Sequence, residues 1–268
     1  MNYKTYPRII AENDTYTSKS FTPSFLQRLS FYPKVLSIFL GANLKTKRNI
    51  YNRFNWIATS LQIFDTLESV GVKFEITGMD NLRLLNGPVV FVSNHMSMLE
   101  TLILPGLIQP LNPLVFVTKK QLSSMPIFGP LNVARHNIIV GRENPREDLK
   151  TVMEEGASRI KNGKSILIFP QKTRTSKFDA SSFNTLGIKL ARRNKVKILP
   201  IAVITDAWTN GKYLKDFGEI DLNKKVYFEF GKPLEIEGNG SEQHKIILKF
   251  IEQKFRDWGR SELIEEQK

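Results

Sequence analysis

The sequence of 268 residues predicts an α/β fold, in which helices flank a mostly parallel sheet. Two observations predict it. From Val72 onward, short apolar segments rich in Val and Ile recur along the chain, and segments with helical spacing of their apolar residues separate them. Such alternation is typical of a parallel sheet with both faces covered by helices. The length suits one large domain, alone or with a small appendage.

Residues 1 to about 20 look irregular, and a helical segment begins at Thr22-Pro23-Ser24. Ser24 and Gln27 have the spacing of a capping box, Pro33 predicts a kink, and Gly41 predicts the end of the helix. Its apolar members are Phe25, Leu26, Leu29, Val35, Leu36, Phe39 and Leu40. A second helix is predicted between Asn49 and Val70, with Ile50, Phe54, Ile57, Leu61, Phe64 and Leu67 at helical spacing.

The basic stretch 45–48 lies between these two amphipathic helices. The arrangement suits a helical hairpin that rests on an anionic bilayer, with apolar side chains in the interface and cations near lipid phosphates. The alternative is that both apolar stripes cover the core of the domain, as in most amphipathic helices. Residues 1–70 are therefore assigned to an N-terminal amphipathic, membrane-binding segment, and residues 71–268 to the α/β domain.

The α/β pattern predicts its elements in order. Strands are expected at residues 72–76, 89–94, 114–120, 137–142, 165–170, 195–204 and 225–231. Helices are expected from about Ser97, over 146–161, near 182–193 and, as the final helix, from Ser241. We find no internal repeat and no low-complexity linker.

Composition excludes several classes of protein and site. Without cysteine there is neither a disulfide framework nor a cysteine metal site, and a cytosol-facing protein fits best. A net charge of +13 favours a polyanionic partner, either nucleic acid or an anionic membrane. No apolar run approaches the roughly 18 residues of a membrane-spanning helix, and the polar start lacks the apolar region of a signal peptide. We therefore expect a peripheral or soluble protein.

The candidate chemistry lies at Ser93-Asn94-His95-Met96-Ser97-Met98-Leu99-Glu100, directly after the apolar strand segment 89–92. Open α/β sheets build their sites at such strand ends. Residues five apart lie about 140° apart around a helix, so His95 and Glu100 can meet only if His95 precedes the helix. A carboxylate on one ring nitrogen would then let the other take a proton from a substrate hydroxyl. The pair alone is a weak signal.

Four blocks in order, from about residue 88 to residue 204, resemble the lysophosphatidate acyltransferase family of the glycerolipid acyltransferase superfamily. The first block, N-H-x-x-x-x-D, is similar to Asn94-His95 followed by Glu100, and V-x-K-K before P-x-F-G is similar to 117–120 and 126–129. The second, a strand ending in Arg, is similar to 137–142. The third, F-P-E-G-T-R-S, is similar to Phe169-Pro170-Gln171-Lys172-Thr173-Arg174-Thr175, and the fourth, an apolar strand with Pro, to 198–203.

The resemblance implies a reaction and a set of roles. His95 would deprotonate an acceptor hydroxyl, which attacks the thioester of an acyl-CoA or acyl-carrier protein, and Glu100 would orient His95. The cations Lys120, Arg142 and Arg174 would bind the acceptor phosphate. Gln171 and Thr173 complete the substrate-binding set. The implied acceptor is a lysophospholipid, most simply lysophosphatidate, with no metal and no bound cofactor, at the cytoplasmic face of a membrane.

The sequence departs from the family's pattern at three positions. Glu100 replaces Asp, which adds one methylene and should adjust the geometry. Gln171 replaces a Glu that would place the glycerol end of the acceptor, and Lys172 replaces a Gly, whose backbone conformation Lys would resist. These changes leave another lysolipid, such as a lyso-aminolipid, or a non-catalytic membrane-binding role open. A nucleic-acid binder ranks last because no recognisable motif supports it. Acyl-chain length, donor and oligomeric state stay open.

Overall fold

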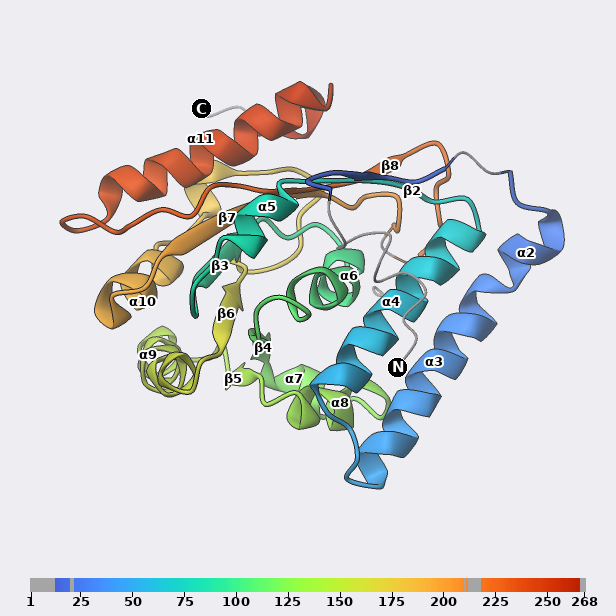
Figure 1. Cartoon of the computed structure of the whole chain (residues 1–268), viewed down its shortest axis with the longest axis horizontal. Coiled ribbons are helices and arrows are strands. Elements are labelled where there is room, and N and C mark those ends of the chain that lie inside the picture. The colour runs from blue at the N-terminus through green and yellow to red at the C-terminus, as the bar shows by residue number, and fades with distance from the viewer. Residues whose placement is uncertain (1–12, 20–21, 210, 212–217, 266–268) are drawn as a thin grey trace.

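The protein, described by a computed structural model over residues 13–19, 22–209, 211 and 218–265, contains a central sheet with helices on both faces (Figure 1). The strands are β1 (Tyr16–Thr17), β2 (Lys73–Thr77), β3 (Val90–Ser93), β4 (Leu114–Lys119), β5 (Ile138–Val140), β6 (Ser165–Ile168), β7 (Ile198–Ile204) and β8 (Lys225–Phe230). The helices are α2 (Phe25–Leu29), α3 (Phe31–Lys47), α4 (Arg53–Ser69), α5 (Met79–Arg83), α6 (Leu99–Ile108), α7 (Lys120–Ser123), α8 (Phe128–Ala134), α9 (Pro145–Lys161), α10 (Leu186–Asn194) and α11 (Ser241–Asp257).

The sheet has the strand order β1-β2-β8-β7-β3-β6-β4-β5. Most neighbours are parallel, as predicted, while β1 runs antiparallel to β2 and β7 antiparallel to β8. The predicted strands from β2 to β8 are all present with small shifts at their ends. The expectation that the first 20 residues are irregular is wrong at β1, and residues 1–12 lie outside the described part of the chain.

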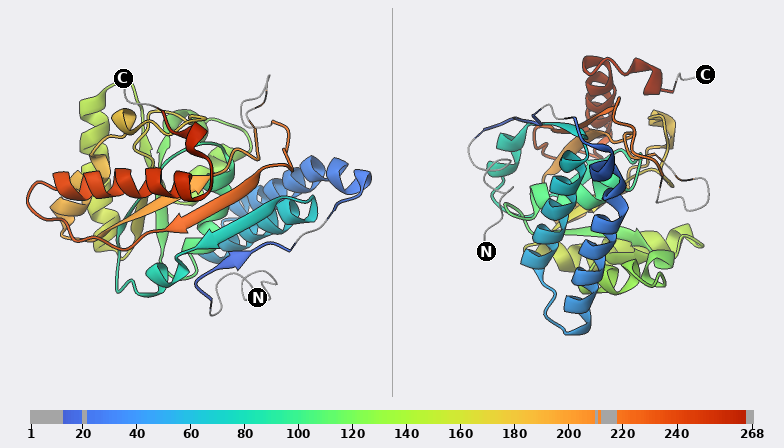
Figure 2. Two further views of the ribbon diagram at one scale, coloured as in Figure 1. Left: turned by 90° about the horizontal axis from the view of Figure 1, so that it is seen from above. Right: turned by 90° about the vertical axis from the view of Figure 1, so that its right-hand side faces the viewer.

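The central strands are apolar on both faces, which explains their unbroken hydrophobic sequence. In β7, Leu199, Ile201 and Val203 point toward α4 and α6, and Ile198 and Ala202 point toward the side covered by α10 and α11. Successive side chains of a strand alternate between the faces of a sheet. The layers are visible in Figure 1, and the left view of Figure 2 shows α11 lying across its face of the sheet.

The two long N-terminal helices lie side by side, α3 against α4 and α4 against α6 (Figure 2, right). The capping box of Ser24 and Gln27 is present at the start of α2. The helix is interrupted at Ser30, between α2 and α3. Pro33 lies in the first turn of α3, where backbone N–H groups have no partner within the helix, so that the missing N–H of proline costs no hydrogen bond. The predicted end at Gly41 is wrong, because α3 continues to Lys47.

The apolar side chains of these helices divide between core and surface. In α4, Ile57, Leu61, Phe64 and Leu67 are buried, so this stripe covers the core. In α3 one face buries Phe31, Val35, Phe39 and Ala42, while Leu36, Leu40 and Leu44 are exposed on another. Thus α3 is apolar on two sides and does not have the single apolar stripe of a simple amphipathic helix. Within the described residues, no helix is both long and apolar enough to cross a bilayer.

Candidate active site

His95 lies in the loop between β3 and α6, and the residue before it fixes that loop to the sheet. The side-chain amide of Asn94 donates to the carbonyl of Val203 at 2.9 Å and accepts from the N–H of Val203 at 2.9 Å. The buried side chain of Asn94 therefore extends the pairing of β3 with β7 by one residue. As a consequence, His95 emerges at the carboxyl end of β3, the edge where open α/β sheets place their sites.

Glu100 is in the first turn of α6 and reaches back to His95, as the spacing required. The distance from His95 Nδ1 to Glu100 Oε1 is 2.7 Å. The N–H groups of Met96 and Ser97 donate to the carboxylate at 2.7 and 2.9 Å, and the hydroxyl of Thr205 donates to Oε2 at 2.6 Å. The carboxylate is fully buried and held by several donors.

The charge state of Glu100 follows from these contacts. Burial alone would raise its pKa, but hydrogen bonds from His95 and Thr205, together with the attraction of a protonated His95, outweigh burial and lower the pKa below its ordinary value. Glu100 is therefore ionised at neutral pH. An ionised carboxylate on Nδ1 holds the proton there and leaves Nε2 as the acceptor nitrogen of the imidazole.

The imidazole of His95 lies between this carboxylate and an aromatic ring. It stacks on Phe169 with ring centroids 4.1 Å apart and an interplanar angle of 19°. Phe169 in turn stacks on Phe116 at 6.2 Å. Stacking and the bond to Glu100 together restrict the rotation of the ring about its side-chain bonds.

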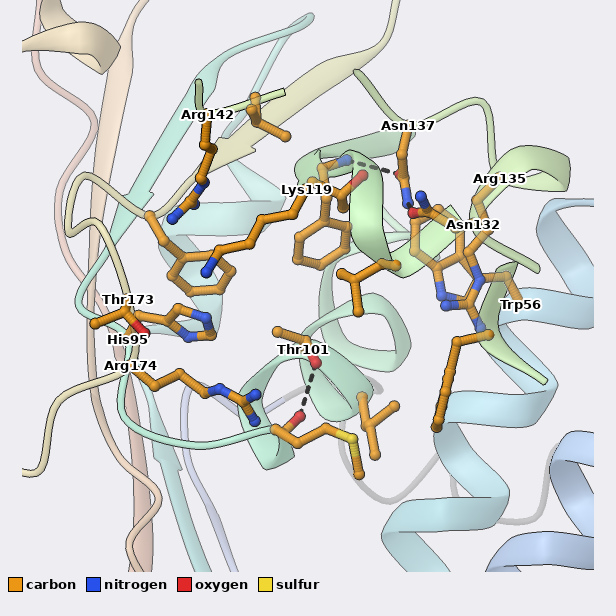
Figure 3. A pocket seen from close by; sticks show the side chains of 18 residues that line it. Trp56, His95, Thr101, Lys119, Asn132, Arg135, Asn137, Arg142, Thr173 and Arg174 are labelled. Carbon is orange, nitrogen blue, oxygen red and sulfur yellow. Dashed lines mark hydrogen bonds between the residues drawn. The ribbon is translucent and has the colours of Figure 1, made fainter. Parts of the chain in front are cut away.

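A cavity of about 240 Å³ opens in front of His95 (Figure 3). At the end that contains His95, its wall includes Lys119, Arg142, Thr173 and Arg174. The opposite end contains Trp56, Asn132, Arg135 and Asn137. The apolar side chains of the wall include Met98, Leu102, Phe116, Leu122 and Phe128. The cavity therefore combines a cationic region beside the imidazole with an apolar wall.

Arg142 follows β5 in a backbone conformation that is rare for residues other than glycine, with φ +66°. The carboxylate of Asp148 holds this turn by accepting from the N–H groups of Gly141 at 3.0 Å and Arg142 at 2.9 Å. Arg142 lines the cavity and is exposed in part. Neighbouring protein atoms displace water from its guanidinium and lower its pKa, while Asp148 opposes this shift. Strained backbone of this kind is often found at binding sites.

The structure brings together most, but not all, of the predicted site residues. His95, Arg142, Thr173 and Arg174 line the cavity, and Glu100 lies behind His95. Lys120 does not reach the cavity, because it begins α7 and is exposed, whereas the neighbouring Lys119 lines the wall.

Gln171 does not line the cavity either. Its side chain is buried and forms hydrogen bonds with the backbone N–H of His95 and the hydroxyl of Thr175. Lys172 does not adopt the positive φ that its replacement of a glycine suggested.

Sequence reasoning missed Ser97, Lys119, Phe169 and Thr205 as contributors to this site. A signal existed for Thr205, because it is a polar residue directly after the apolar strand β7, at the same sheet edge as His95. Within the part of the chain that the structure describes, no three His, Asp or Glu side chains are grouped so that they could hold a metal ion.

Comparison with known proteins identifies the family of this chain. A sequence model of the family described as Acyltransferase matches residues 73–204. The 1-acyl-sn-glycerol-3-phosphate acyltransferase of Pseudomonas aeruginosa is 28% identical over 186 residues, which cover 69% of this chain and 68% of that protein. The enzyme of that name from Escherichia coli is 27% identical over 161 residues, which cover 59% of this chain and 61% of its own length.

The fold also matches a solved structure. The crystal structure of the 1-acyl-sn-glycerophosphate (LPA) acyltransferase PlsC from Thermotoga maritima aligns with a TM-score of 0.65 over 91% of this chain and 97% of that one, at 18% identity. This likeness shows the α/β fold, and the family follows from the sequence matches. The chain belongs to the lysophosphatidate acyltransferase family and is an O-acyltransferase.

Proposed function

We propose that the protein transfers a fatty acyl group from acyl-CoA or acyl-carrier protein to the hydroxyl of a lysophospholipid, with lysophosphatidate as the preferred acceptor. The observation that carries the proposal is the buried carboxylate of Glu100 on Nδ1 of His95, 2.7 Å away, at the edge of a cavity with cations beside the ring. The family's relatives carry the name 1-acyl-sn-glycerol-3-phosphate acyltransferase, which supports the choice of acceptor.

In the proposed reaction, Nε2 of His95 takes the proton of the acceptor hydroxyl as its oxygen attacks the thioester carbonyl. Glu100 stabilises the imidazolium that forms. Collapse of the tetrahedral intermediate breaks the carbon–sulfur bond, and the thiolate leaves with the proton that His95 returns. The products are the acylated lipid and a free thiol, so no nucleophilic side chain of the protein is acylated.

The acceptor phosphate is assigned to Arg142, Arg174 and Lys119. All three line the cavity at the end that contains His95, and Figure 3 shows their side chains on either side of the imidazole. Cationic donors bind phosphate oxygens by charge-assisted hydrogen bonds, Arg often with two at once. Lys119 takes the role that the sequence suggested for Lys120, and Thr173, which also lines the cavity, stays a candidate contact.

The acceptor assignment is tested with a panel of lysolipids of one acyl chain, with and without the phosphate, against wild type and Arg142→Gln. Loss of one charge-assisted bond, about 1.5–3 kcal/mol, predicts a fall in kcat/KM of about 10- to 100-fold for lysophosphatidate. For monoacylglycerol the fall should be less than about threefold. Exposed Arg193 on α10, which does not line the cavity, gives the matched control Arg193→Gln. Equal activity on both acceptors, or equal losses on both, would contradict the phosphate assignment.

We also propose that the protein acts as a peripheral protein at the cytoplasmic face of a membrane. Support comes from the exposed Leu36, Leu40 and Leu44 of α3 and from the basic residues Lys45, Lys47 and Arg48 at its end. Exposed apolar patches rimmed by cations fit an anionic bilayer.

A further inference from the structure

Gln171 lies directly behind His95, and both ends of its amide are used within the protein. Oε1 accepts a hydrogen bond from the backbone N–H of His95 at 2.7 Å, and Nε2 donates to Oγ1 of Thr175 at 2.7 Å. Only 2% of the residue is exposed, and it does not contribute to the cavity wall. This position differs from the acceptor-binding role that the family resemblance implied.

The contacts of Gln171 fix the direction of each proton. The N–H of His95 can only donate, so the amide oxygen must face it and the amide nitrogen must face Thr175. The hydroxyl of Thr175 therefore accepts from Gln171 and gives its own proton to the carbonyl of Lys177, 2.6 Å away. Each donor in this chain, from His95 to Lys177, is matched by one acceptor.

A second bond joins the same two loops. The backbone N–H of Thr175 donates to the carbonyl of His95 at 3.0 Å. Both backbone polar groups of His95 are thus bound to Gln171 and Thr175, while its ring is bound to Glu100. Separate partners therefore hold the backbone and the ring of the same residue.

We propose that Gln171 is a positioning residue, which holds the backbone of His95 through its bonds to His95 and Thr175 and so keeps Nε2 directed into the cavity. The proposal rests on the proposed role of His95 as general base. In this proposal Gln171 does not contact the acceptor and acts only through the position of His95.

The proposal gives a reason for an amide where the family pattern has a carboxylate. A carboxylate has no proton for Thr175, so Thr175 would have to turn its hydroxyl toward Glu and leave the carbonyl of Lys177 without this donor. It would also add a negative charge beside His95, which favours the imidazolium. Gln171, Thr175 and Lys177 are therefore matched to one another in this chain.

The test measures acyl transfer by the full-length chain, with lysophosphatidate and an acyl-CoA as the probes. In Gln171→Met both amide bonds are lost at similar side-chain length, and in Thr175→Val only the hydroxyl is replaced. Small misplacement of a catalytic group can cost up to about 100-fold in rate, so we expect kcat to fall about 10- to 100-fold in Q171M and less in T175V. KM for the acceptor should stay within about twofold, and the double variant should be no worse than Q171M, because both residues act in one chain.

Gln171→Glu adds a readout that simple structural damage would not move. The added negative charge beside His95 favours the protonated imidazole, so the acidic limb of the profile of kcat/KM against pH should move to higher pH. A merely damaged site would lose the same factor at every pH. Circular dichroism establishes that each variant is folded, and if Q171M does not fold, T175V and Q171E carry the test.

Two results would overturn the proposal. One is a rise of about tenfold in acceptor KM with kcat unchanged in Q171M, which would indicate direct contact with the acceptor. The other is wild-type kcat in T175V together with an unshifted pH profile in Q171E. Failure of the proposed function would look different, because wild type would then transfer no acyl group or His95→Ala would be as active as wild type.

Discussion

At Glu100, hydrogen bonds and charge oppose the cost of burying a carboxylate. Burial of a lone carboxylate is costly, and in this site the N–H groups of Met96 and Ser97, the hydroxyl of Thr205 and the ring of His95 compensate for the lost water. Their combined effect lowers the pKa of Glu100. Ionisation of Glu100 is therefore more favourable in the folded protein than in the unfolded chain, and it stabilises the folded state.

This balance predicts how stability depends on pH. Because the pKa of Glu100 is lower in the folded state than its ordinary value of 4.5, its contribution is fully present above pH 4.5 and is lost as pH falls through the folded pKa. Glu100→Gln cannot titrate. We expect the melting temperature of wild type to fall more steeply than that of E100Q below pH 4.5, as measured by calorimetry from pH 7 to pH 3. Parallel curves for the two proteins would contradict an ionised Glu100.

The sequence could predict the pair of His95 and Glu100. It could not predict that Lys119, and not Lys120, lines the cavity, or that Gln171 is bonded to His95. Their pairing follows from local geometry, since five positions separate a loop residue from the first turn of a helix. Lys119 and Lys120 differ only in whether the residue ends β4 or begins α7, and sequence patterns do not fix element ends to one residue. The burial of Gln171 depends on contact with His95, 76 positions away, which no local pattern contains.

At the scale of elements, α3 makes a prediction about the membrane. Leu36, Leu40 and Leu44 follow one line on its surface, with 47%, 48% and 54% of each residue exposed. Replacing all three by Ser removes apolar surface that would enter the bilayer, at about 1 kcal/mol or more for each Leu. We expect co-sedimentation with anionic phospholipid vesicles to weaken at least tenfold, with little change in stability.

Exposed Leu149 on α9 and Ile246 on α11 give the matched control for this prediction. Their replacement by Ser removes exposed apolar surface away from α3 and should leave vesicle binding unchanged. Equal binding by the triple variant and wild type would exclude this face of α3 as the membrane contact.

The helix spacing in residues 22–70 predicted two long helices and the capping box at Ser24, and these are confirmed. It could not predict that α3 continues through Gly41. Glycine disfavours a helix by only about 1 kcal/mol. Tertiary packing compensates here, since Ala42 is buried and Asn43 donates to the carbonyl of Ile127 at 2.6 Å.

At the scale of the molecule, the N-terminal helices and the sheet share one core. Phe39 of α3 and Phe64 of α4 belong to the same apolar cluster as Phe74 of β2, and the rings of Phe64 and Phe74 lie 4.3 Å apart. The boundary assigned at residue 70 falls between α4 and β2, but the two parts are not separated by it in space.

The shared core predicts that residues 71–268 do not fold alone. Removal of α3 and α4 would expose α6 and one face of the sheet, and loss of even one large core side chain costs about 3–5 kcal/mol. We expect the truncated chain to lack a cooperative thermal transition by calorimetry, while full-length chain shows one. A stable, cooperative fragment 71–268 would contradict a shared core.

The overall fold could be predicted because apolar β-branched strands alternate with helices from Val72 onward, and such alternation has few compatible architectures. The antiparallel pairing of β1 with β2 and of β8 with β7 could not be predicted. Strand direction at β8 depends on how the segment after β7 returns to the sheet, and Tyr16–Thr17 is too short to show an alternating pattern.

The central claim is that His95, oriented by Glu100, is the base for acyl transfer to a lysophospholipid. It is tested most directly by transfer from an acyl-CoA or acyl-carrier protein to lysophosphatidate by purified wild type, His95→Ala, Glu100→Gln and Glu100→Asp. We predict that H95A and E100Q lose about 10²- to 10⁴-fold in kcat with folding intact, and that E100D, which keeps the carboxylate, retains more activity than E100Q. Transfer by H95A at the wild-type rate would contradict the account.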